Sequence, residues 1–371
     1  MKKFRAIIFL IAAVLLGVAA LGGCTDKNVV YEFDSAKPWG GGTALYERCG
    51  YDVTLTERVA SGKDTVDGRV LAEGKAAFTL EYYENNEDQI LLTYEFSLTY
   101  SPDPANGADA GLTDTVFSKV RFMTKGCAPV YSEKTQTYAP RKNDALQYSD
   151  GVVLKYSDQR SYRTSADYSA NKAVVETGRT VNADGEPSSG YSGKKEFALK
   201  SGETAFDTDQ LFYAVRALTS TKPAGAEKSS GFLGCGSVGG GSDNVTLTAS
   251  VPYDIAATID KKGRYKNTPI SVLIQTDLVP VKLPEFAAEY LPTPENGEYS
   301  VKCLKTSLSI NSKTPGPPTV LLITEPDTKF TKNNAVTNKI IYRIERTSYN
   351  LAQTAEAARL SLTLTDYATV K

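Results

Sequence analysis

The chain has 371 residues, and its 42 basic and 43 acidic side chains give a formal net charge of −1. It contains no histidine, which excludes Ser-His-Asp and Cys-His catalysis and every metal site that needs an imidazole. Its basic side chains form no cluster suited to nucleic acid, so we expect no nucleic-acid partner, and we predict no metal and no cofactor.

The first residues have the three parts of an export signal. Residues 1–5 are positively charged, residues 6–21 form an uncharged apolar run, and two glycines then precede Cys24. A positive start, a short apolar core and small residues at its end are typical of a secretory signal. The apolar run is shorter than the ~20 residues that a membrane-spanning helix needs. The sequence therefore predicts a removable signal.

The end of this segment, Leu21-Gly22-Gly23-Cys24, resembles the lipobox of bacterial lipoproteins, which has an aliphatic residue, two small residues and an invariant cysteine. The resemblance covers only the first 24 residues. It implies that residues 1–23 are cleaved off and that the Cys24 thiol receives a diacylglyceryl group. Two acyl chains anchor a protein stably, whereas one holds it only marginally. The alternative is an ordinary secretory peptide with a chance cysteine.

The predicted location follows from this resemblance. It implies an extracytoplasmic lipoprotein whose partner is the membrane that holds its lipid (palmitate or a similar acyl group). Thr25, rather than an acidic residue, follows Cys24. In an organism with two membranes this resembles lipoproteins sorted to the outer membrane. In an organism with one, the anchor stays in the outer leaflet of the cytoplasmic membrane.

The mature chain divides into two parts by composition. Residues 24–45 are predicted to be a flexible tether, because they are aperiodic and include Lys37-Pro38-Trp39 and three glycines. Residues 46–371 are predicted to form a β-rich domain. The proline-rich segment 278–297 is a possible sub-domain boundary within it.

Alternation of apolar and polar residues is the main structural signal. Residues 90–100 alternate throughout, which predicts a long strand with one buried face. Residues 78–82 alternate just before them, and the polar run 84–88 predicts a hairpin loop. Further strands are predicted at 115–123, 130–138, 152–156, 174–181, 245–251, 270–275, 301–310, 320–324, 339–345 and 360–365.

The predicted helices are few. Asp207 has the properties of an N-cap for a helix over 208–219, because Gln210 completes a capping box and Phe206 and Leu211 are spaced as a hydrophobic staple. A second helix is predicted near 350–359, where alanine is frequent. The expected fold is therefore mainly β, a large antiparallel curved sheet or open barrel with one or two packed helices.

Four cysteines remain beyond the lipobox: Cys49, Cys127, Cys235 and Cys303. None lies in a Cys-x-x-Cys pair, which argues against a zinc or redox site. Outside the cytoplasm an even number permits two disulfides. If they form, we expect Cys49–Cys127 and Cys235–Cys303. The alternative is buried free thiols that pack as small apolar groups.

The sequence predicts no enzyme and no catalytic residue. Residues 234–239 match G-x-G-x-x-G, but a strand is predicted after them, where dinucleotide binding requires a helix. Glu81 and Glu95 lie on neighbouring predicted strands and could form the carboxylate pair of a carbohydrate-active enzyme. Alternation alone also predicts polar residues there, on the solvated face of a hairpin.

Long alternating strands, a capped helix and a lipid anchor together resemble the LolA/LppX-like envelope lipoproteins, in layout only, over about residues 46–371. In that group a curved antiparallel sheet wraps a helix and can leave an apolar cavity. The resemblance implies non-covalent binding of a lipid or another apolar or amphipathic ligand. Leu92, Tyr94, Phe96 and Leu98 would then face the ligand, or else fill a core. The alternative function is a structural or protein-interaction lipoprotein of the cell surface.

Overall fold

The computed structural model describes sixteen segments of the chain: 30–33, 46–102, 110–124, 127–138, 146–147, 153–154, 160–167, 172–181, 192–198, 205–221, 242–249, 268–282, 300–310, 319–324, 339–349 and 356–368. Cys24, Cys235 and the predicted signal peptide lie outside these residues. Within the described segments, no helix is both long enough and apolar enough to cross a membrane.

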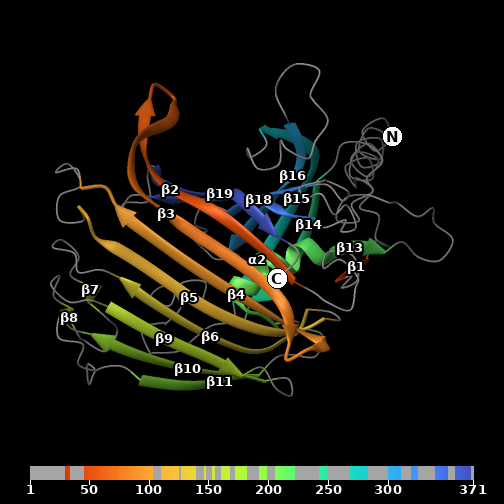
Figure 1. Cartoon of the computed structure of the whole chain (residues 1–371). Helices are drawn as coiled ribbons and strands as arrows, with labels where there is room; N and C mark the ends of the chain where they lie inside the picture. Colours follow the sequence, from red (N-terminus) through yellow and green to blue (C-terminus); the bar gives the residue numbers. More distant parts are fainter. Residues whose placement is uncertain are drawn as a thin grey trace, which may run out of the picture.

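One large curved sheet dominates the described residues, as Figure 1 shows, and it confirms the predicted mainly β fold. It has fifteen strands in the order β11-β10-β9-β6-β5-β4-β3-β2-β19-β18-β17-β16-β15-β14-β12. All neighbours are antiparallel except β12 and β14, which are parallel. The strands are β2 (Tyr46–Ser61), β3 (Asp64–Tyr83), β4 (Asn86–Tyr100), β5 (Thr113–Met123), β6 (Pro129–Tyr138), β9 (Arg160–Asp167), β10 (Lys172–Val181), β11 (Ser192–Ala198), β12 (Ala205–Phe206), β14 (Ser242–Ala249), β15 (Thr268–Lys282), β16 (Ser300–Ile310), β17 (Thr319–Thr324), β18 (Ile341–Tyr349) and β19 (Glu356–Ala368).

The sheet is built from two meanders that meet at β2 and β19. The first runs from β2 to β6 and continues through β9, β10 and β11, and the second runs from β14 to β19. At the junction Leu362 of β19 lies opposite Val53 of β2. Two short pairs lie outside this sheet, β1 (Val30–Phe33) with β13 (Leu218–Thr221) and β7 (Leu146–Gln147) with β8 (Val153–Leu154).

Tight turns connect the first strands of the sheet. Glu84 and Asn85 have φ values of 51° and 60° and join β3 to β4. Positive φ at both central positions is the mark of the type I′ turn, whose twist matches that of a hairpin. The predicted hairpin loop over residues 84–88 is therefore a two-residue turn, and its last three residues already belong to β4.

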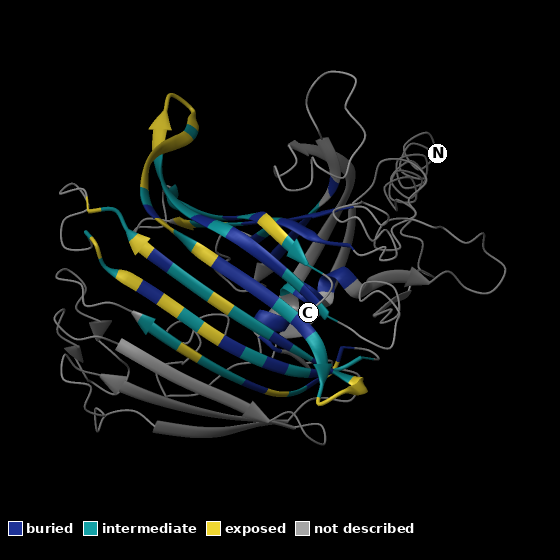
Figure 2. Ribbon diagram, viewed as in Figure 1, coloured by how far each residue is buried: buried dark blue, intermediate teal, exposed yellow. Residues whose placement is uncertain are grey.

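The tip of the β2–β3 hairpin projects from the sheet as an exposed arm, residues 56–70 (Figures 1 and 2). The pairing register shifts on either side of Thr56, where the arm leaves the sheet. Such irregularities bend a strand and increase its local twist. The change of direction therefore coincides with a break in the regular ladder.

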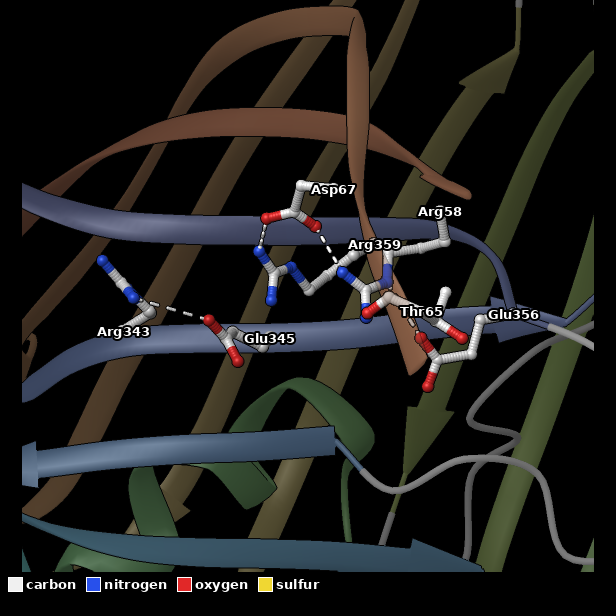
Figure 3. Close-up of polar contacts among 7 residues, drawn as sticks. All are labelled: Arg58, Thr65, Asp67, Arg343, Glu345, Glu356 and Arg359. Carbon is white, nitrogen blue, oxygen red and sulfur yellow. Dashed lines mark hydrogen bonds and ion pairs between the residues drawn. The ribbon is translucent and has the colours of Figure 1, made fainter. Parts of the chain in front are cut away.

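A network of arginines and carboxylates holds the base of the arm (Figure 3). Arg58 donates from Nη1 to Asp67 Oδ1 at 2.6 Å, from Nε to Glu356 Oε2 at 2.8 Å and from Nη2 to the Thr65 carbonyl at 2.8 Å. Arg359 also pairs with Asp67. The network thus ties both strands of the arm to β19.

The predicted helix and its cap are present. Helix α2 (Thr208–Ala214) continues as one 3₁₀ turn, η2 (Val215–Ala217). Asp207 Oδ1 accepts from the backbone N–H of Asp209 at 3.0 Å, and Gln210 Oε1 accepts from that of Asp207 at 3.3 Å. This is the predicted capping box. The helical segment ends before residue 218, earlier than predicted, because the chain there pairs with β1.

One prediction about local structure was wrong. Residues 356–359 form the start of β19 rather than a helix, because they pair with β2 and β18 and this pairing overrides the helix propensity of alanine. Residues 278–282, part of the predicted sub-domain boundary, belong to β15 and pair with β16. Residues 30–33, in the predicted tether, form β1.

Candidate ligand-binding cavity

The concave face of the sheet can be read from its register, because directly opposed residues of antiparallel strands share a face. Phe96 of β4 lies between Val116 of β5 and Ala76 of β3. One step along the strands, Leu98 lies opposite Asp114. These residues therefore form neighbouring rows on one face, and that face carries the buried core.

A cavity of about 250 Å³ lies on this face, just below the range of ~300–1,000 Å³ typical of ligand pockets. Its apolar lining comes from β3, β4, β5, α2, β18 and β19: Phe78, Tyr94, Phe96, Leu98, Val116, Phe212, Ile344, Leu360 and Leu362. Its polar lining residues are Asp114, Lys134, Gln136, Asp209 and Arg346. β4 and β18 both line it although β3, β2 and β19 separate them in the sheet, so the curvature of the sheet creates this site.

Small residues lie in the middle of this face. β3 contributes Ala72, Gly74 and Ala76 in alternation with outward-facing residues. A Cβ at Gly74 would lie 1.9 Å from the Ser97 carbonyl oxygen, so β3 and β4 approach too closely there for any larger residue. Small side chains at the centre of a curved sheet leave volume that larger ones would fill.

The four predicted ligand-facing residues divide into two groups. Tyr94, Phe96 and Leu98 line the cavity. Leu92 lies opposite Leu80 and is fully buried in the core, outside the cavity lining. Contact of the first three with a ligand stays a prediction. Leu92 fills the core, which was the alternative stated for these residues.

Aromatic rings close the end of the cavity beside the helix. Phe78 stacks on Tyr94 with 4.3 Å between ring centroids. It also contacts Tyr213 of α2, with centroids 5.0 Å apart. Such ring pairs contribute about 0.5–1.5 kcal/mol each beyond the area they bury. They give this end of the cavity a rigid wall.

A partly buried ion pair lies at the same end. Lys134 Nζ of β6 lies 2.8 Å from Asp209 Oδ1 of α2, and the two side chains are 20% and 7% exposed. The other Asp209 oxygen, Oδ2, is buried and accepts no hydrogen bond in the described part of the chain. A buried acceptor without a donor costs about 1–3 kcal/mol. Among the described residues that line the cavity, only Asp209 has a buried acceptor oxygen without a hydrogen-bond donor.

The helix cap adds a titratable group to this end. Burial raises the pKa of Asp207 above its ordinary 3.8, and the neighbouring Asp209 carboxylate raises it further. A hydrogen bond from Ser132 and the charge of Lys134 act in the opposite direction. Protonation of Asp207 is therefore easier in the folded protein than in the unfolded chain.

A second ion pair, which is fully buried, fixes the other end of the helical segment. Arg216 donates from Nη1 and Nη2 to the two carboxylate oxygens of Glu47, at 2.6 and 3.0 Å, and from Nε to the Lys339 carbonyl. Burial by itself lowers the pKa of Arg216, but the Glu47 carboxylate outweighs this and holds the pKa above its ordinary value. The pair and the Lys339 contact lock η2 onto β2 and onto the segment just before β18. Nothing in the local sequence pattern indicates this contact.

Two of the predicted disulfide cysteines are free thiols. Cys49 and Cys127 are buried and unbridged, so the expected Cys49–Cys127 bond was wrong. Cys49 lies on β2, and Cys127 follows β5. β3 and β4 lie between β2 and β5, and neighbouring strands are ~4.8 Å apart. The distance between β2 and β5 therefore exceeds the ~7 Å between Cα atoms that a disulfide can span. Burial raises the pKa of Cys127 to about 12. Cys303 is buried on β16, and its predicted partner Cys235 lies outside the described residues.

The candidate carboxylate pair does not converge. Glu95 lies opposite Ala77, and Ala77 is four residues from Glu81 along β3, about 13 Å at ~3.3 Å per residue. Glycosidase carboxyls lie about 5–10 Å apart. Both glutamates lie on the face opposite the cavity. Across the described segments, no group of three or more Cys, Asp or Glu side chains could hold a metal ion.

Sequence reasoning missed every polar residue of the cavity. Lys134 and Gln136 lie within a predicted strand, and Asp114 lies one residue before the predicted start of its strand, at residue 115. The register places all three on the concave face. Arg346 lies beyond the predicted end of its strand, at residue 345. These polar cavity residues could have been identified from the sequence, because a charged residue at an otherwise apolar position of a strand indicates a polar group on the buried face.

The comparisons with known proteins identify no family. No family model matches the chain, and no curated protein matches it. A similar solved structure is a β-barrel-like protein of domain of unknown function DUF1849 from Brucella abortus. That structure is 9% identical, with a TM-score of 0.44, and the match covers 88% of this chain and 98% of that one.

Proposed function

We propose that this protein is a membrane-anchored envelope lipoprotein that binds a lipid or another apolar or amphipathic molecule without catalysing a reaction. The observation that carries the proposal is the cavity on the concave face, with its mainly apolar lining. Apolar walls with a few polar groups are typical of small-molecule sites. The lipobox supports the anchor and the extracytoplasmic location. The candidate carboxylate pair, Glu81 and Glu95, lies too far apart for glycoside cleavage, which favours binding over that reaction.

The exposed arm favours a second candidate function, a role in protein interaction. Val59, Val66 and Val70 are 42–45% exposed on it. Val59 lies opposite Val66, so their side chains form one small apolar surface. Apolar residues on a projecting hairpin are suited to contact another protein, and this role is compatible with ligand binding in the cavity.

The binding proposal is tested by filling the cavity. Val116 lines it, whereas the adjacent Phe117 is 39% exposed on the opposite face of β5. We expect Val116→Trp to abolish binding of 1-octanol, a minimal amphiphile, and Phe117→Trp to leave it unchanged. Native mass spectrometry of the full chain, released from detergent, measures the bound fraction. Equal binding by both variants, or none by the wild type, would overturn the proposal.

A further inference from the structure

We infer that the cavity takes a neutral amphiphile whose polar group is a hydroxyl, held by Asp209 and Lys134. The inference rests on the proposed function and specifies its ligand class. In the inferred complex the hydroxyl donates to Asp209 Oδ2 and accepts from Lys134 Nζ. The apolar part of the molecule lies against the aliphatic and aromatic lining.

The first support is the unused acceptor. Asp209 Oδ2 is buried and has no hydrogen-bond partner in the described part of the chain, and Asp209 is one of the residues that line the cavity. Its side chain is 7% exposed, so bulk water does not solvate this oxygen freely. A ligand donor at this point would recover the free energy that the desolvated oxygen costs.

The second support is the donor beside it. The ammonium group of Lys134 carries three N–H donors. Asp209 Oδ1, 2.8 Å away, accepts one of them. Lys134 also lines the cavity. A ligand oxygen close to the ion pair can therefore accept from the same ammonium group.

The charges of the pair select against ionic head groups. The charges of Lys134 and Asp209 sum to zero, so the ion pair has no net positive or negative charge. A carboxylate or phosphate that approaches Lys134 meets the Asp209 carboxylate, and an ammonium that approaches Asp209 meets Lys134. A buried charge without a free counter-charge is costly. A hydroxyl is both donor and acceptor, so it satisfies both groups without adding a charge.

The other charged groups that line the cavity do not change this balance. Arg346 lies opposite Leu360, and its side chain is exposed, so solvent screens its charge. Asp114 lies opposite Leu98 and is engaged by other groups of the protein. Asp207 is not a lining residue, and burial raises the pKa of its carboxyl group.

The volume sets the size of the ligand. About 250 Å³ corresponds to roughly eight volumes of ~30 Å³, the share of one water molecule in the liquid. This space suits one short alkyl chain or a small ring system, or the hydroxyl end of a larger alcohol. From the ion pair, the apolar path runs past Val116 to Leu98 and Leu362.

The test uses two isomers that differ in hydrogen bonding. 1-Octanol has a hydroxyl donor, whereas 1-methoxyheptane has the same formula and can only accept. We measure the apparent Kd of each for the full chain in one detergent by native mass spectrometry. The preference is the Kd of the ether divided by that of the alcohol. Partition into micelles is the same for every variant, so it cancels when preferences are compared between variants.

We expect Asp209→Asn to reduce the preference about tenfold or more, because a hydrogen bond to a charged acceptor is lost. Glu95→Gln, which removes a carboxylate from the opposite face of β4, should leave it unchanged. Octanoate and octylamine should bind the wild type more weakly than 1-octanol. An unchanged preference in Asp209→Asn, or tighter binding of octanoate, would overturn the inference. If these results came with 1-octanol binding that Val116→Trp abolishes, the proposed function would still stand.

Discussion

At the residue scale, the buried ion pair between Glu47 and Arg216 is the contact whose loss should destabilise the protein most. Arg216 is fully buried, and Glu47 is 1% exposed. Removing two charges from water is expensive, and the bidentate geometry with the Lys339 carbonyl offsets this cost. Loss of either partner would leave the other charge buried and uncompensated.

We expect Glu47→Gln to lower the free energy of unfolding by about 3–5 kcal/mol, the range for breaking a buried ion pair. The control is Arg48→Met, which breaks the exposed 2.8 Å pair between Arg48 and Asp366 and should cost about 1 kcal/mol or less. Urea unfolding followed by circular dichroism measures both. Equal effects would contradict a structural role for the buried pair.

At the scale of elements, the cap of α2 links helix stability to pH. Asp207 has a pKa raised above 3.8 in the folded protein, chiefly by burial. Because folding favours its protonated form, its contribution to stability is fully present below pH 3.8 and is lost as pH rises through the folded pKa. The titration of Asp207 therefore contributes nothing to stability above its folded pKa.

Asp207→Asn removes this titration and keeps a good N-cap residue. We expect the free energy of unfolding of the variant to increase relative to wild type as pH rises from about 3 to about 7. Denaturant unfolding at several pH values measures this difference. Asp64→Asn, on the exposed tip of the arm, is the control. A difference between Asp207→Asn and wild type that does not change with pH would contradict the assignment.

At the scale of the whole molecule, one large sheet organises the described part of the chain. The second meander returns to the first at β2 and β19, so the two halves of the chain share one concave face and one cavity. A lipid on Cys24 would hold this body at a membrane surface, close to a source of amphiphilic molecules.

The anchor is tested by Cys24→Ala. Because the thiol is the atom that would be acylated, we expect the variant to incorporate no labelled fatty acid, while the wild type incorporates it. Cys49→Ala, a buried thiol on β2, is the control and should leave labelling unchanged. Labelling that persists in Cys24→Ala would refute the lipobox interpretation.

The sequence alone determined the features that depend on neighbouring residues. Alternation over residues 90–100 identified β4, and the spacing of Asp207 and Gln210 identified the capping box, because side-chain periods of 2 and 3.6 follow from local backbone geometry. The same reasoning missed β2, although Cys49, Tyr51 and Val53 alternate there with Gly50, Asp52 and Thr54.

Only the tertiary structure decided which strands share the cavity. Leu98 and Leu362 both line it, yet their strands belong to different meanders, and no local pattern encodes the pairing of β2 with β19. The contact between Lys134 and Asp209 is likewise a tertiary feature, because the local patterns place the two residues in a strand and in a helix that are far apart in the sequence. Strand order and curvature arise from long-range pairing and from burial of the whole concave face, so they belong to the complete fold rather than to any segment.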